Sequence, residues 1–242
     1  MRQLFYALGA LAIIVVAAVF AYVTYFYKPA TCFDSVQNQD ETGIDCGGSC
    51  ALLCEAPTIS VVWARPVKAA DGVYHAVAMV RNPDTTAGGT FSYEVSLYDN
   101  DNILIARRDG SFTIGPGEVT PLFEANIVTG ERVPSRAFFD ITPGAFQRTE
   151  RTLSPVRVVN WNLDETGLRL SADIQNYGTS TAPDTRVTAL LYDTADTLIS
   201  ASQTLSGPLA SGERKTILFT WQEPFSVSPA RIDIVPRVVN AQ

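Results

Sequence analysis

The chain has 242 residues, 25 of them acidic and 18 basic, with a formal net charge of −7 and a sequence pI of about 4.7. This acidic balance, without a basic patch, excludes nucleic acid and anionic lipid surfaces as expected partners. The single histidine, His75, leaves no histidine cluster for a metal and no Ser-His-Asp set, and neither Gly-x-Ser-x-Gly nor His-Glu-x-x-His occurs, so we expect a protein that is not an enzyme.

The first predicted element is a helix in the apolar run from Leu4 to Tyr27, which contains 24 residues and no charge. At about 1.5 Å per residue such a helix is ~36 Å long, enough to cross a hydrocarbon core of about 30 Å. A cleavable signal peptide is the alternative, because Val19-Phe20-Ala21 resembles a small-x-small cleavage site. The apolar part of a signal peptide has only about 7–15 residues, so the length favours an uncleaved anchor over residues 1–28.

Charge and aromatic residues predict the orientation of this span. Arg2 and the terminal amine precede it, which by the positive-inside rule places the N-terminus in the cytoplasm. Aromatic residues gather at its other end, at Tyr22, Tyr25, Phe26 and Tyr27, as they do at a membrane–water interface. We therefore expect a single-pass protein of the cell membrane with the bulk of the chain extracytoplasmic.

The four cysteines of the chain lie in a block of 23 residues directly after the span, at Cys32, Cys46, Cys50 and Cys54. Thiols oxidise outside the cytoplasm, so the block predicts two disulfides, for which three connectivities are open. Zinc is the competing interpretation, because four close thiolates can form a tetrahedral site. The spacing lacks the usual Cys-x-x-Cys pairs, which favours disulfides. Gly47-Gly48 would supply the positive φ of a tight turn between bridged cysteines.

Five side chains with oxygen donors lie within 12 residues of the same block. They are Asp34, Asn38, Asp40, Glu41 and Asp45. Calcium takes about 6–8 oxygen ligands in flexible loops, so these residues are the candidate metal ligands of the chain. Their spacing differs from that of an EF-hand loop, and the alternative is that they are simply solvated. We expect no other cofactor.

The residues of this block resemble a small module of bacterial surface and envelope proteins, of the form Cys-x-Asp-Gly-x-x-Asn-x-x-Glu-Thr-x-x-Asp-Cys-Gly-Gly-x-Cys-x-x-Cys. The matching positions are Cys32, Asp34, Asn38, Glu41, Thr42, Asp45, Cys46, Gly47, Gly48, Cys50 and Cys54. Ser35 replaces the usual glycine, and the last spacer, with Leu52-Leu53, is one residue longer. The resemblance implies that residues 29–56 form an extracytoplasmic, disulfide-stapled linker rather than a catalytic unit.

From residue 57 onward the sequence has the pattern of β-strands. Phe91, Tyr93, Val95 and Leu97 alternate with polar residues, as on a half-buried strand, and 168–175 repeats the pattern. We predict about seven strands in 57–150, near 58–66, 73–82, 91–98, 102–108, 110–114, 118–126 and 136–142. A similar number is predicted in 155–240, near 156–163, 167–176, 185–193, 197–202, 203–208, 214–221 and 230–238.

The two β-rich halves are related by an internal repeat. Asn82 corresponds to Asn176, Leu97-Tyr98-Asp99 to Leu191-Tyr192-Asp193 and Leu104 to Leu198, all at an offset of 94. Gly117-Glu118 matches Gly212-Glu213 at 95, and Trp63 matches Trp161 at 98. Repeats of this length are domains, so we predict an all-β fold of tandem immunoglobulin-like β-sandwiches at 57–150 and 151–242. We expect them to fold separately, with a small mutual contact and a joint near Arg151–Pro155.

The repeated residues also resemble two known classes of sandwich domain. Phe91 to Asp99, the turn at Asn100-Asp101-Asn102 and Gly115-Pro116-Gly117-Glu118 are similar to the FxLYD-type domains of bacterial cell-surface proteins. Ile174 to Ala182, with Leu190 to Asp193, is similar to the CARDB class of immunoglobulin-like adhesion modules. Both resemblances imply spacer or interaction modules of the cell envelope.

Three functions from different classes follow. We favour a non-enzymatic envelope protein in which an anchor and a disulfide-braced linker present two sandwiches to another envelope protein or to a cell-wall component. The second is a dedicated subunit of a membrane complex, because small residues such as Gly9 and Ala17 allow close helix approach. The third is a carbohydrate-binding module that uses exposed aromatics such as Trp63, Trp161 or Trp221, although Trp221 more simply fills a core.

Overall fold

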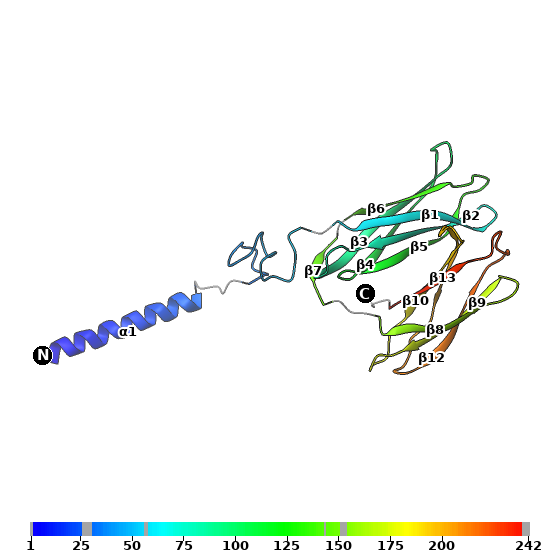
Figure 1. The fold of residues 1–242 in the computed structure, drawn as a ribbon. Coiled ribbons are helices and arrows are strands. Elements are labelled where there is room, and N and C mark those ends of the chain that lie inside the picture. The colour runs from blue at the N-terminus through cyan, green and yellow to red at the C-terminus, as the bar shows by residue number, and fades with distance from the viewer. Residues whose placement is uncertain (1, 26–30, 56–57, 143, 151–153, 239–242) are drawn as a thin grey trace. The chain divides into compact units, whose positions relative to one another are not determined.

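The computed structural model describes residues 2–25, 31–55, 58–142, 144–150 and 154–238 (Figure 1). The chain divides into two compact units, Met1–Cys54 and Glu55–Gln242. The first unit contains the helix and the cysteine block, and the second contains every named strand of the described residues. The predicted all-β class, with an N-terminal helix and a disulfide-rich linker, is confirmed.

The N-terminal helix α1 extends over Arg2–Tyr25. Its stretch Leu8–Tyr25 has a mean hydropathy of 2.3, and none of it is buried against the rest of the protein. The Thr24 hydroxyl donates to the Phe20 carbonyl at 2.7 Å, so this polar group is satisfied within the helix, as an apolar surrounding requires. By length and composition α1 can cross a membrane, as an anchor or a signal sequence does. Phe26 and Tyr27 lie outside the described residues.

The first sandwich consists of two antiparallel sheets. Its strands are β1 (Ser60–Ala70), β2 (Val73–Arg81), β3 (Ala87–Tyr98), β4 (Leu104–Ile114), β5 (Val119–Val128), β6 (Arg136–Thr142) and β7 (Phe146–Arg148). One sheet has the order β1-β2-β5, and the other has the order β4-β3-β6 with β7 also paired to β3. The predicted alternation of β3 is confirmed, because Phe91, Val95 and Leu97 are buried between the sheets. Tyr93 donates its hydroxyl across the core to Glu124 of β5 at 2.7 Å.

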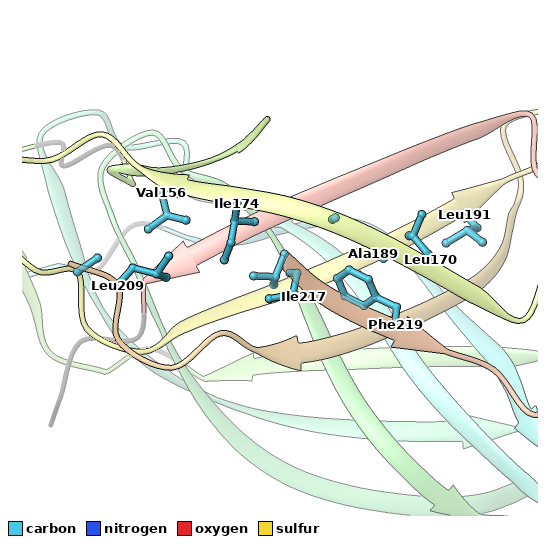
Figure 2. Packing of buried hydrophobic residues seen from close by; sticks show 11 residues of the cluster. Val156, Leu170, Ile174, Ala189, Leu191, Leu209, Ile217 and Phe219 are labelled. Atoms are coloured by element: carbon cyan, nitrogen blue, oxygen red, sulfur yellow. The ribbon is translucent and has the colours of Figure 1, made fainter. Parts of the chain in front are cut away.

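The second sandwich repeats this architecture. Its strands are β8 (Val156–Leu163), β9 (Arg169–Asn176), β10 (Thr185–Tyr192), β11 (Leu198–Leu205), β12 (Arg214–Thr220) and β13 (Arg231–Val238). The sheets have the orders β12-β9-β8 and β11-β10-β13. Their buried side chains include Val156, Leu170, Ile174, Ala189, Leu191, Leu209, Ile217 and Phe219, which gather between the strands in Figure 2. This sandwich therefore has a hydrophobic core of its own.

Two of the predicted strand divisions are wrong. The two strands predicted near 102–108 and 110–114 are one strand, β4, and the two predicted near 197–202 and 203–208 are one strand, β11. Asp109-Gly110 has the composition of a turn, but Gly110 lies opposite Tyr93 in the β3–β4 ladder. A Cβ atom at Gly110 would lie 2.3 Å from the Tyr93 ring, so the glycine makes room for that ring within a continuous strand.

The repeated residues occupy equivalent places in the two sandwiches. Asn82 and Asn176 are fully buried where β2 and β9 end, and the side-chain oxygen of each accepts the N–H two residues ahead. Asp99 and Asp193 each accept the N–H groups two and four residues ahead, next to a register shift in the β3–β4 ladder and in the β10–β11 ladder. The repeat is therefore one of corners and turns as well as of strands.

The register corrects one of the correspondences. β1 and β8 contain an extra residue relative to the neighbouring strand at equivalent places, Val62 and Val159, and β1 has a second one at Ala69. Beyond these bulges, Trp63 pairs with Met79, and the equivalent pair in the second sandwich is Asn160 with Asp173. Trp63 and Trp161 are thus one residue out of register, and on strands that places them on opposite faces.

Candidate functional site

The cysteine block is closed by two disulfides, which select one of the three open connectivities. Cys32 is bonded to Cys50, and Cys46 is bonded to Cys54. Cys32, Glu41 and Cys50 are the one group in the described part of the chain whose donor atoms lie close enough for a shared metal ion, within 4.8 Å of one another. Both sulfur atoms of that group are in a disulfide, so they are not thiolates that could hold zinc.

Glycine at two consecutive positions lets the block fold back on itself. Gly47 and Gly48 both have positive φ, +78° and +51°. A Cβ atom would lie 1.9 Å from the Thr42 hydroxyl at the first position and 2.1 Å from the Asp40 carbonyl at the second. The predicted tight turn between bridged cysteines is therefore confirmed. Ser35, which replaces the glycine expected from the sequence resemblance, also has a positive φ, of 61°.

The candidate calcium ligands are engaged with the block's own backbone and side chains. Asp45 accepts the N–H groups of Asp34 and Ser35, and Asp34 accepts those of residues on either side of it. Asn38 donates its side-chain amide to Asp34 at 3.0 Å and its backbone N–H to Glu41 at 3.0 Å. Asp40 accepts the Ser49 hydroxyl at 2.9 Å. These oxygen atoms shape the turns of the module, and calcium binding there stays a prediction.

The two sandwiches share a second hydrophobic cluster. Its buried members are Val67, Val77, Leu190, Tyr192, Leu198 and Ala201, from β1 and β2 of the first sandwich and from β10 and β11 of the second. Because side chains alternate across a strand, β10 places Val187, Ala189 and Leu191 in its own core while Leu190 and Tyr192 face the other sandwich. β2 is buried on both faces in the same way.

An aromatic group and two ion pairs flank this cluster. The ring of Trp63 packs edge-on against Tyr192 with centroids 6.5 Å apart, and burial raises the pKa of Tyr192. Arg237 of the second sandwich contacts Glu118 of the first at 2.8 Å, and Lys68 contacts Glu223 at 3.5 Å. A cluster with buried members from both sandwiches therefore joins them.

The single histidine lies on the same sheet as this interface. His75 packs against Phe123 with ring centroids 4.8 Å apart, and its Nδ1 accepts the Asn126 N–H at 3.1 Å. Burial lowers the pKa of His75 below its usual 6.5, so the ring is neutral at pH 7. A neutral ring that accepts a backbone hydrogen bond has a structural role.

The three tryptophans differ in their exposure. Trp63 is partly buried in the interface, and Trp221 packs on Phe225 at 5.0 Å and against the second core, as predicted for a core residue. Trp161 is 46% exposed on the edge strand β8. Only Trp161 of the three therefore offers an open aromatic face for a ligand.

No protein-family model matches the chain, and no curated protein is similar to it. Solved structures with a partial likeness include red sea bream transglutaminase, at 15% identity and a TM-score of 0.23 over 74% of this chain and 29% of that chain. Others are the Amycolatopsis orientalis exo-chitosanase CsxA (12%, TM-score 0.18, 68% and 21%) and a β-glucuronidase from glycoside hydrolase family 2 (9%, TM-score 0.19, 90% and 26%). The chain spans less than a third of each, and likeness at this level carries no argument about activity.

Proposed function

We propose that this chain is a single-pass, membrane-anchored protein whose bulk lies outside the cytoplasm, and that it acts as a structural or interaction module of a bacterial cell envelope without enzymatic activity. The observation that carries the proposal is the order of its parts. The charge-free stretch of α1 is followed by a segment whose four cysteines are all in disulfides. Disulfides persist in oxidising compartments, so the segment after the helix belongs outside the cytoplasm.

The two sandwiches are the part that would meet a partner. Sheet β1-β2-β5 and sheet β11-β10-β13 contribute to the shared cluster, which leaves β4-β3-β6 and β12-β9-β8 as the outer sheets. The face of β9 turned away from the core contains Arg169, Ser171, Asp173 and Gln175, which is a polar surface. The proposed partner is another envelope protein or a cell-wall component. The resemblance to FxLYD-type and CARDB modules supports such a role.

Protease accessibility tests the topology. A protease added to intact cells or spheroplasts should remove the sandwiches and leave a small membrane-bound fragment that contains α1. A tag placed at the N-terminus should stay protected until the membrane is permeabilised. Release of the whole ectodomain by signal peptidase, or full protection of the sandwiches, would contradict the proposed anchor.

The exposure of Trp161 favours a second candidate function, the binding of glycans. Trp161 lies opposite Ala172 in the β8–β9 ladder, and its ring leaves an aromatic face open on an edge strand. Sugar rings stack on such aromatic faces. Binding to a glycan array that is lost in Trp161→Ala, but kept in the interface variant Trp63→Phe, would support this function over a purely protein-binding one.

A further inference from the structure

The two disulfides of the cysteine block have opposite degrees of exposure. Cys50 is 1% exposed, and Cys32, to which it is bonded, is half-buried. Cys54 is exposed, and its disulfide with Cys46 is therefore open on one side. Thiol–disulfide exchange requires a thiolate to reach one sulfur, so access alone favours the Cys46–Cys54 bond as the reactive one.

A carboxylate lies beside the Cys50 sulfur of the Cys32–Cys50 disulfide. Glu41 is only 8% exposed, and its Oε1 lies 3.2 Å from the Cys50 sulfur. Its other oxygen accepts the Asn38 N–H, which holds the side chain in place. A negative charge at this distance repels an approaching thiolate and disfavours a second negative charge on the Cys50 sulfur. Glu41 therefore protects Cys32–Cys50 by charge as well as by burial.

The exposed disulfide has the opposite kind of neighbour. The Thr42 oxygen lies 3.2 Å from the Cys54 sulfur, and because a disulfide sulfur has no hydrogen, the hydroxyl is the donor. A hydroxyl that donates to sulfur withdraws electron density from it and favours attack by an anion. Gly43 covers this disulfide without a side chain, since a Cβ there would lie 2.8 Å from both the Cys46 and the Cys54 sulfur.

We propose that Cys46–Cys54 is a thiol-exchange site for the cysteine thiolate of a partner protein, whereas Cys32–Cys50 is the structural bond of the module. The partner thiolate bonds to the Cys54 sulfur, the Cys46–Cys54 bond breaks, and Cys46 leaves as a thiolate that takes a proton from water. The product is a mixed disulfide between Cys54 and the partner, with no net change in oxidation state. Attack by Cys46 on that mixed disulfide reverses the reaction and releases the partner.

Exchange kinetics on the full chain in detergent test this site, with reduced glutathione as the probe. Samples are quenched over time with an alkylating reagent and mapped by mass spectrometry. Glutathione should appear on Cys54 and alkylation on Cys46, at a rate at least about tenfold above that of any modification at Cys32 or Cys50. Equal rates at the two disulfides, or faster modification at Cys32–Cys50, would overturn the proposal.

Four variants, in two matched pairs, separate the roles of the neighbours from a general loss of structure. Thr42→Val should slow exchange at Cys46–Cys54 by about two- to fivefold, and Thr42→Ser, which keeps the hydroxyl, should restore it. Glu41→Gln should speed exchange at Cys32–Cys50 by about three- to tenfold, whereas Asp40→Asn, whose carboxylate bonds Ser49 instead of facing sulfur, should not. If Thr42→Ser is as slow as Thr42→Val, or if both acidic variants act alike, the geometry described does not control the reaction.

Discussion

Asn82 and Asn176 show how single buried polar residues hold the corners of both sandwiches. The Asn176 amide nitrogen donates to the carbonyls of Ser180, Leu209 and Ala210 at 2.8–3.1 Å, and that of Asn82 donates to Ala87 and Gly115 at 2.8 Å. Each asparagine thereby ties the end of one strand to two loops. The offset between them is visible in the sequence, but these bonds depend on loops that only the fold brings together.

Asn176→Ala should destabilise the second sandwich by about 1–3 kcal/mol, because it leaves buried carbonyls without donors. The measurement is urea unfolding of the part of the chain after α1. Asn160→Ala is the matched control, since Asn160 is exposed on β8. A loss of stability that is the same in both variants would contradict the role of the corner.

The stability of the chain should fall as the pH decreases through the usual histidine range. The folded pKa of His75 is below 6.5, so the unfolded chain takes up a proton near pH 6.5 before the folded chain does. Stability from His75 is complete above about pH 7 and is lost as the pH falls toward the folded pKa. Because this is the only histidine, the difference between the wild type and His75→Gln in urea unfolding across this range isolates its effect. An unchanged slope in the variant would exclude it.

At the residue scale, the sequence predicts some backbone conformations, such as that of Ser35, but not the disulfide pairing. The module that this block resembles in sequence has glycine at this position, and the positive φ of Ser35 is one that glycine adopts most easily. The disulfide pairing, in contrast, could not be derived from spacing, because all three connectivities suit a short polar segment. The roles of Asp34 and Asp45 as acceptors of backbone N–H groups could not be predicted either. In a sequence, a carboxylate that caps a turn cannot be told from one that binds an ion.

At the scale of elements, the strands follow from alternation wherever one face meets solvent. β3, β9 and β12 are of this kind, and their predicted positions agree with the structure to within a few residues. β2 and β10 are buried on both faces and read as nearly continuous apolar runs. Such a run indicates a central strand but does not say what covers its second face, so the shared cluster could not be predicted.

An acidic row crosses the outer sheet of the first sandwich. Glu94 of β3 lies opposite Asp109 of β4 and Asp140 of β6, and Arg107 contacts Glu94 at 3.1 Å. Like charges directly opposite each other destabilise a sheet. Asp140→Asn should therefore raise the free energy of unfolding by roughly a few tenths of a kcal/mol, and this gain should be larger at low salt. Asp101→Asn, in a turn, is the control, and an equal gain from it would point to net charge instead of the row.

For the molecule as a whole, the shared cluster makes the two sandwiches depend on each other. Separating them exposes Leu190, Tyr192 and Leu198 on the second sandwich. Residues 152–242 expressed alone should fold around their own core but unfold at lower urea than in the full chain, and should self-associate. Leu190→Lys in the isolated segment should restore a monomer by making that face polar. Light scattering and urea unfolding measure both effects.

Expressing each sandwich alone also shows which outcome would contradict this interdependence. If 57–150 and 152–242 are each as stable and as monomeric alone as they are together, the interface contributes little and the sandwiches are independent spacers. In the full chain, Leu190→Lys should lower stability because it buries a charge between the sandwiches, whereas Leu205→Lys, on the exposed end of β11, should not.

The bulges at Val62 and Val159 affect whether neighbouring copies of the protein can associate through their edge strands. β1 and β8 are edge strands, and an edge strand with regular spacing is a template on which a neighbouring copy can add its own strand. A protein held at a membrane meets its copies at high local density, where such polymerisation is a constant hazard. The extra residue at Val62 in one edge and at Val159 in the other interrupts the row of N–H and C=O groups and twists it away. The bulges at Val62 and Val159 thus keep these edges from recruiting one another into fibres.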